Sequence, residues 1–311
     1  MFPFFKNSDP SSMFKSIGLA YFATIGYDNI TAFSKESVNP KRDIPVAIIS
    51  SVMISGIVYI IMSFVVIGVV PNEMLSSNQG LVNAFASYGW LISSKIMSFG
   101  SLIGLTTSMF SCLLGQPRVF QTIAEDGLLP VSISRFNPKT QVATNATYVS
   151  GIIAVFCAMF LNLETLANCI SLACLMSYGI ACTASIESRY DRSTFPVFRR
   201  VCFIAFILFS IILGVSSKNY IPKPILCAII ILMMLIIIFV SSLKQTNIPS
   251  KKEFKCPLMP LVPFIGVFTN FYMYGAIELF PHILYGIYLL IGAVIYLTFG
   301  VHHSKLNRKM D

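Results

Sequence analysis

The sequence predicts an all-α protein that crosses a membrane several times, and two observations carry this prediction. Of the 311 residues, 55% are hydrophobic and only 11% are charged, whereas a soluble domain carries about 25% charged residues. Apolar stretches long enough to cross a bilayer also recur along the chain. These spans are expected to be helices, because open strand edges are not tolerated in lipid.

Nine apolar stretches of 17 to 27 residues are predicted to span the membrane. A helix needs about 20 residues to cross a hydrocarbon core of about 30 Å. The predicted spans are residues 14–33, 44–70, 91–114, 142–161, 165–187, 201–217, 221–243, 257–278 and 281–301.

The Lys and Arg residues predict how these spans are oriented. Of the 22, 17 fall in loops on one side, and the other five are Lys6, Lys15, Lys95, Lys218 and Lys223. Cytoplasmic loops are enriched in Lys and Arg, so the C-terminus is predicted to be cytoplasmic and, with nine spans, the N-terminus external. Residues 1–12 carry no secretory signal pattern, so we expect further residues upstream. The net charge of +9 does not indicate nucleic-acid binding, because the basic residues lie in short clusters between spans.

The first predicted span contains residues that interrupt a helix or carry charge. Gly26, Asp28 and Asn29 lie within the run Tyr21 to Thr31. An ionisable residue inside a span usually faces a cavity or a partner. Asp28 is therefore either a carboxylate at the cytoplasmic end of the helix or part of a broken transporter helix, in which unwound backbone near the midplane binds substrate.

Proline-containing segments flank several later spans. An Asn39-Pro40 turn precedes the second span, and Pro45 is predicted to begin its helix. After the third span, Pro117–Pro130 combines two prolines, an arginine, an acidic pair and a glycine. This block is predicted to form a short amphipathic helical turn on the membrane surface that ties one helix to the next. The eighth span is entered by prolines at a three-residue period: Pro257, Pro260 and Pro263.

The sequence shows no pattern typical of a metal site, a cofactor site or a catalytic site. The eight cysteines form no CxxC pair. The three histidines lie at span ends, without Glu or Cys at the spacing of metal ligands. Neither a Ser/His/Asp arrangement nor a phosphate-binding loop nor a dinucleotide fingerprint is present. No enzyme activity, metal or cofactor is therefore predicted.

Taken in order and at their spacing, these segments resemble the cationic amino acid transporters of the amino acid–polyamine–organocation superfamily. The resemblance rests on the broken span, the loop Glu36–Pro45, the block Pro117–Pro130 and the proline-rich entry Phe254–Pro263. The last two spans are similar to helices thirteen and fourteen of the fourteen-helix members.

The resemblance implies that the nine spans are helices six to fourteen and that the first five helices are absent. The fold would then be an incomplete LeuT-like inverted repeat. Its implied parts are an external segment (1–13), the second half of the transporter core (14–187), accessory helices (188–303) and a cytoplasmic tail (304–311).

The implied function is alternating-access transport of amino acids, cationic ones such as arginine, lysine and ornithine, across the plasma membrane. One alternative is a truncated or degenerate membrane protein that does not transport and associates with other subunits. Another is a carrier of neutral amino acids or polyamines, which the last two spans disfavour. The expected partners are an amino acid substrate, the lipid bilayer, and a missing N-terminal half or other transporter subunits. The chain expressed alone is expected not to transport.

The resemblance also assigns site residues in the broken helix. Phe22 corresponds to an aromatic gate over the substrate, and Asp28 to a carboxylate in proton coupling or gating. Thr24 is also assigned to substrate binding, but it departs from the family, which usually has an aromatic residue there, so the substrate preference stays open. The unwound backbone that binds substrate is assigned to Ala23, Ile25 and Gly26.

Helix eight of the resemblance adds polar side chains to this site. Helical spacing puts Ser101, Thr107, Ser108 and Ser111 near one face. They either bind substrate or form the interhelical hydrogen bonds that are common for Ser and Thr in membranes. Tyr178, in helix ten, either closes the pathway or packs as an ordinary tyrosine.

Overall fold

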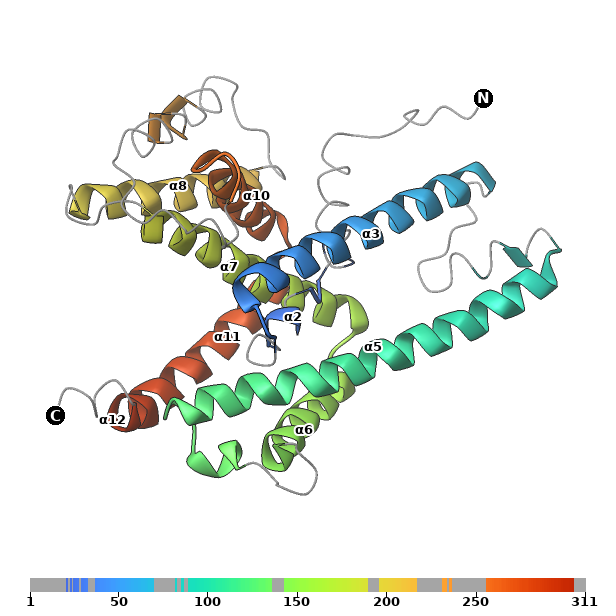
Figure 1. Cartoon of the computed structure of the whole chain (residues 1–311), viewed down its shortest axis with the longest axis horizontal. Helices are drawn as coiled ribbons and strands as arrows, with labels where there is room; N and C mark the ends of the chain where they lie inside the picture. The colour runs from blue at the N-terminus through green and yellow to red at the C-terminus, as the bar shows by residue number, and fades with distance from the viewer. Residues whose placement is uncertain are drawn as a thin grey trace. The chain divides into compact units, whose positions relative to one another are not determined.

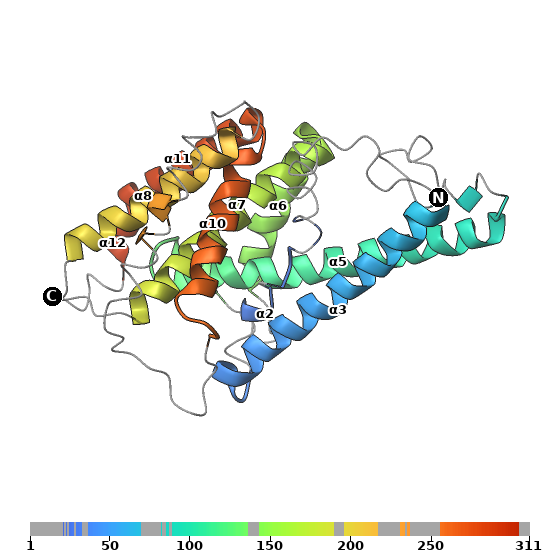
Figure 2. The same ribbon diagram turned by 90° about the horizontal axis from the view of Figure 1, so that it is seen from above.

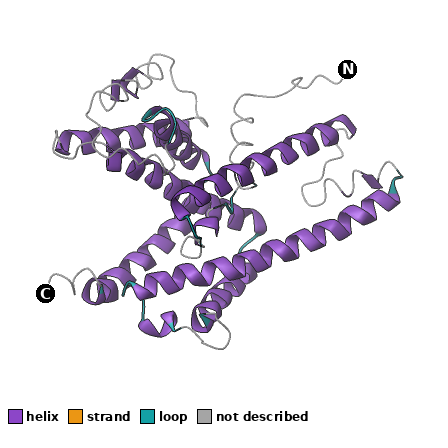
Figure 3. Ribbon diagram, viewed as in Figure 1, coloured by secondary structure: helices purple, strands orange, loops and turns teal. Residues whose placement is uncertain are grey.

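Helices make up all regular secondary structure in the residues that the computed structural model of the chain describes (Figure 3). This part of the chain is residues 21, 23, 25–27, 29–32, 37–69, 82, 85–86, 89–135, 143–189, 196–216, 231–233, 235–236 and 256–304. It confirms the predicted all-α class. The chain divides into a first unit, residues 1–25 and 157–293, and a second unit, residues 26–156 and 294–311.

Seven apolar helices account for seven of the predicted spans (Figure 1). Five are long and apolar enough to cross a membrane: α3 (Pro40–Val69), α5 (Leu91–Glu125), α7 (Leu163–Arg189), α8 (Pro196–Ser216), and α11 (Leu279–Ile295) with its continuation η4 (Tyr296–Gly300) and α12 (Val301–His303). Two are shorter: α6 (Thr144–Phe160) and α10 (Leu261–Ala276). The short helix α2 (Asn29–Ala32) and the 3-10 turn η3 (Val131–Ser134) complete the described elements.

The remaining two predicted spans, 14–33 and 221–243, lie mostly outside the described residues. The structure therefore agrees with a helical protein that crosses the membrane several times, and the number of nine spans stays a prediction.

The start of α3 corrects the sequence analysis, which placed it at Pro45. The helix begins five residues earlier, at Pro40, and Pro45 lies inside it. The carbonyl of Asn39 accepts the N–H groups of Arg42 at 3.1 Å and Asp43 at 2.9 Å. A proline suits the first position because the N–H that it lacks would have no partner there. Pro45 removes only one later hydrogen bond, so the helix continues through it.

The end of α5 corrects a second prediction, that of a separate helical turn after residue 114. The helix runs on through Pro117 to Glu125, a length of 35 residues. At 1.5 Å per residue this is about 52 Å, well beyond a hydrocarbon core of about 30 Å. Gly127 ends it with a φ of +81°, and the N–H of Leu128 donates to the carbonyl of Ile123 at 3.2 Å. This is the glycine-terminated hydrogen-bond pattern of a Schellman motif.

The core of the first unit forms where α10 packs against α7 and α8 (Figures 1 and 2). Phe264 of α10 stacks on Phe203 at a centroid distance of 5.8 Å and meets Phe206 edge to face at 5.1 Å. A Cβ added at Gly214 of α8 would overlap the Tyr272 carbonyl oxygen, and one at Gly275 of α10 would overlap the carbonyl oxygen of Ile211. These two glycines let the backbones of α8 and α10 approach closely, as small residues do in membrane helices.

An ion pair between a buried arginine and a partly exposed glutamate joins the end of α7 to the start of α8. Nη2 of Arg199 lies 3.6 Å from Oε1 of Glu187. The arginine side chain is 2% exposed and the glutamate side chain 36% exposed. Removing the carboxylate would leave a guanidinium out of contact with solvent, so the pair fixes how α8 begins relative to α7.

In the second unit, the C-terminal part of α5 is its packed region. Gly115 and Pro117 of α5 are buried. A Cβ at Gly127 would overlap the carbonyl oxygen of His303, and one at Gly300 would lie 3.3 Å from Cδ2 of Leu128. The turn after α5 therefore lies directly against the last turn of the described chain.

Candidate functional site

The first predicted span is interrupted in the described residues, as the sequence analysis expected. Tyr21 is helical, whereas Ala23 and residues 25–27 adopt turn conformations before α2 begins at Asn29. Gly26 has a φ of +124°, a backbone angle that residues with a Cβ rarely adopt. The N–H of Asn29 donates to the carbonyl of Gly26 at 3.2 Å, a bond of three residues rather than the four of an α-helix. The prediction that Ala23 to Gly26 is unwound agrees with the described residues Ala23, Ile25 and Gly26, and the turn continues to Tyr27.

Three of the predicted site residues cannot be placed in this geometry. Phe22, Thr24 and Asp28 lie outside the described residues. The gate, the substrate contact and the coupling role that the resemblance gives them stay predictions. Ala23 is exposed, and Ile25 and Gly26 are half-buried.

The structure brings Tyr178 of α7 into contact with Tyr21, immediately before the interruption. The two rings meet edge to face, with centroids 6.4 Å apart and an interplanar angle of 65°. The Tyr21 hydroxyl donates to Oδ1 of Asn270 at 3.1 Å. Asn270 is 8% exposed, and its Nδ2 donates to the carbonyl of Gly266 at 2.7 Å.

Asn270 is a polar residue that the sequence analysis missed. It lies within the predicted span 257–278 and is buried among apolar residues of α10. An amide in the middle of an apolar stretch is itself a signal, because burying it without hydrogen bonds is costly. Its partner Tyr21 stands 249 residues away in the sequence, so no local pattern identifies the pair.

The predicted polar residues of α5 form hydrogen bonds within their own helix. The Ser101 hydroxyl donates to the carbonyl of Ser98, and the Thr107 hydroxyl to that of Ile103, both at 2.8 Å. Ser111 likewise donates to Thr107 at 3.0 Å. These three residues and Ser108 are exposed. Each bonded hydroxyl has used its one donor on the backbone and keeps acceptor capacity toward a ligand or another helix.

A second contact joins the interrupted segment to α5 within the second unit. A Cβ added to Gly115 would lie 2.8 Å from Oδ1 of Asn29, so the asparagine side chain rests directly on the glycine. Asn29 was noted in the sequence as part of the interruption, whereas Gly115 was not singled out. The contact positions the start of α2 on the C-terminal half of α5.

The described residues contain no group of three or more His, Cys, Asp or Glu side chains placed to hold a metal ion. The polar groups that they offer near the interruption are carboxamides, hydroxyls and backbone. Such groups bind and orient a small polar solute by hydrogen bonding.

The sequence matches a known protein family and several of its relatives. The family described as amino acid permease matches residues 1–299. A vacuolar cationic amino acid transporter 4 of Arabidopsis thaliana is 27% identical over 93% of the chain and 58% of its own length. The human cationic amino acid transporter 4 is 25% identical over 93% of the chain and 55% of its own length. A branched-chain amino acid permease of Bacillus subtilis is 26% identical over 95% of the chain and 52% of its own length.

The chain thus spans about half the length of these relatives. The resemblance noted in the sequence is confirmed, and with it the integral, multi-pass membrane class. Because the family match covers nearly all of its residues, the chain belongs to the amino acid permease family.

Proposed function

We propose that this protein acts in alternating-access transport of amino acids, with cationic amino acids as its substrates. The observation that carries the proposal is the helix interruption at Gly26, with a φ of +124°, in a member of a permease family. Interrupted helices leave backbone N–H and C=O groups outside the helical ladder, where they bind the polar groups of a substrate.

The cationic preference rests on relatives named for it, from Arabidopsis thaliana and Homo sapiens. A second candidate is neutral amino acid transport, which the relative named as a branched-chain permease favours. Asp28 is a carboxylate in the interrupted span and suits a cationic substrate, whereas Thr24 departs from the family's aromatic residue and leaves room for other side chains.

In the proposed architecture the chain supplies helices six to fourteen of a LeuT-like fold. Residues 14–187 form one half of the core, and residues 188–303 form accessory helices. The other half, helices one to five, would come from sequence outside these residues or from another subunit. Polar groups left in hydrocarbon cost several kcal/mol each, so the interrupted helix needs such a partner. The remaining alternative is a subunit that does not transport and associates with other subunits.

The test is uptake of labelled arginine, lysine and leucine by cells deficient in their own carriers. Cells would express the 311-residue chain alone, or together with the five-helix N-terminal half of a cationic relative. We expect saturable arginine and lysine uptake only with both parts, and we expect Phe22→Ala and Asp28→Asn to reduce it. Uptake of leucine in place of arginine would favour the neutral substrate class. A chain that reaches the membrane and supports no uptake in either form would contradict transport.

The proposed location is the plasma membrane. The proposed cytoplasmic C-terminus is supported by the 17 basic residues on one side against five on the other. Cysteines introduced at Ser77 and Lys251 should react with an impermeant thiol reagent from opposite sides, Ser77 from outside. Reaction of both from the same side would overturn this topology.

A further inference from the structure

Just before the interruption, Tyr21 contacts an aromatic ring of α7 and an amide of α10. The proposed transport cycle assigns no role to these two contacts. Tyr21, Tyr178 and Asn270 all belong to the first unit. They come from the start of the interrupted span, from α7 and from α10 respectively. In the resemblance α10 is an accessory helix, with no assigned part in substrate binding.

The amide of Asn270 is oriented by its own helix. Its Nδ2 donates to the carbonyl of Gly266 at 2.7 Å, which leaves Oδ1 as the acceptor for the Tyr21 hydroxyl at 3.1 Å. Gly266 is itself held against α7, because a Cβ there would lie 2.8 Å from Sγ of Cys182. The acceptor presented to Tyr21 is therefore fixed by the packing of α10 on α7.

Tyr21 is held at two points of its side chain. Its hydroxyl reaches Asn270, and its ring meets Tyr178 edge to face at 6.4 Å. Two residues later the chain turns at Ala23, and it has left the helix at Ile25 to Tyr27. Backbone outside the helical hydrogen-bond pattern is not held in one direction by that pattern. The position of the last anchored residue, Tyr21, therefore determines where the unwound stretch begins.

We propose that Asn270 is a positioning residue, which holds Tyr21 and thereby sets the placement of the unwound stretch that follows. The proposal rests on the proposed function for its consequence, namely that the accessory helix α10 tunes substrate binding. Packing alone does not explain an amide here, since its neighbours on α10, Phe264, Val267 and Phe271, are buried and apolar and leucine has a similar volume.

The experiment measures how fast a cysteine in place of Ala23, which is exposed, reacts with a methanethiosulfonate reagent. The variants are Tyr21→Phe, Asn270→Leu and the double substitution, in the full chain with its own cysteines replaced. Tyr21→Phe removes the hydroxyl and keeps the ring on Tyr178. The matched control is Thr269→Val, since the neighbouring Thr269 hydroxyl donates to its own helix at the carbonyl of Ile265 at 2.9 Å.

We expect each single variant to change the reaction rate at position 23 about three- to tenfold and the double variant to change it no further. Thr269→Val should stay within about twofold of the parent. A cysteine in place of Ser171, which is 2% exposed on α7 of the same unit, should keep its low rate in all variants. A general loosening of the first unit would raise that rate as well and would contradict a positioning role.

Unchanged labelling at position 23 in Tyr21→Phe, or additive effects in the double variant, would overturn the inference even if the protein transports. If Asn270→Leu fails to fold, Tyr21→Phe alone decides. Labelling does not require transport. A coupled change at position 23, together with no arginine uptake when the five-helix N-terminal half of a cationic relative is co-expressed, would uphold the inference and refute the proposed function.

Discussion

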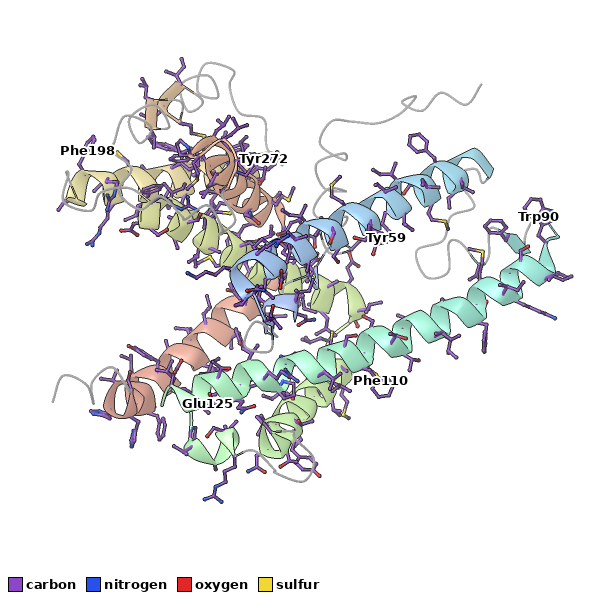
Figure 4. All side chains as sticks on the ribbon, viewed as in Figure 1. Tyr59, Trp90, Phe110, Glu125, Phe198 and Tyr272 are labelled. Carbon is purple, nitrogen blue, oxygen red and sulfur yellow. The ribbon has the colours of Figure 1, made fainter. Side chains whose placement is uncertain are left out.

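The helices α7 and α8 bury a large part of their surface within the chain, whereas α3 and α5 bury almost none. In their most apolar stretches, 28% of α7 and 33% of α8 is buried, against 0% in α3 and in α5. Phe110 of α5 projects away from the helix, and Tyr272 lies among the side chains where α10 meets α8 (Figure 4). Similar apolarity thus accompanies two different surroundings, and hydropathy alone does not distinguish them.

The glycines show the same difference. Gly214 and Gly275 sit where two backbones meet, and a Cβ on either would overlap a carbonyl oxygen. Gly56, Gly100 and Gly104, in α3 and α5, have nothing within 4 Å of such a Cβ. Glycine inside a helix therefore marks a close crossing at Gly214 and Gly275 and open surface at Gly56, Gly100 and Gly104.

Polar side chains follow this division too. Asn270 in α10 reaches Tyr21, far away in the sequence, while Ser101 and Thr107 in α5 donate to their own helix. In the first unit, side-chain contacts therefore hold neighbouring helices together. The exposed apolar side chains of α3 and α5 are suited to contact with lipid or with further helices.

The largest effect is expected from Gly214→Ala, which tests the close crossing of α8 and α10. The new methyl group would overlap the backbone oxygen of Tyr272, which cannot rotate away, so we expect a loss of about 1–3 kcal/mol or more. Thermal unfolding in detergent measures it. The control is Gly104→Ala in α5, which meets no atom within 4 Å and should gain up to about 1 kcal/mol from helix propensity. Equal losses in the two variants would refute the comparison.

Gly127→Ala should have an intermediate effect, because the turn after α5 in the second unit also makes a tight contact. The substitution forces a non-glycine residue to a φ of +81° at a cost of about 1–2 kcal/mol, and its Cβ meets the His303 carbonyl oxygen. We expect faster hydrogen exchange in residues 300–304. Gly127→Asn tolerates the backbone angle and keeps the collision, so recovery of protection in this variant would show that only strain matters.

The smallest effect on stability is expected from Ser101→Ala and Thr107→Val. Both hydroxyls are exposed and bonded within their own helix, so the free energy of unfolding should change by less than about 0.5 kcal/mol. Arginine uptake, measured in cells that also express the five-helix N-terminal half of a cationic relative, should fall if these hydroxyls accept hydrogen bonds from substrate. Unchanged uptake would remove them from the proposed site.

The sequence predicted the helices better than their ends and partners. Seven apolar helices fall on predicted spans, because hydrophobic length is a local property. The start of α3 was missed because Pro40 suits a first helical position, and the end of α5 because Pro117 removes only one hydrogen bond. The interruption at Gly26 was predicted from residue type and resemblance. The contacts of its flanking residues, Tyr21 with Asn270 and Asn29 with Gly115, were not predicted, because they depend on which helices meet.

The contact between Gly127 and His303 has a consequence for biosynthesis. Residue 303 leaves the ribosome about 175 residues after residue 127, which at 5–20 residues per second is a delay of roughly 10–35 s. The second unit includes residues 294–311, so it stays unfinished throughout that interval while the helices of the first unit are already emerging. During this interval the turn after α5 lacks its contact with the segment around His303. A membrane chaperone would therefore find this surface most accessible in this period.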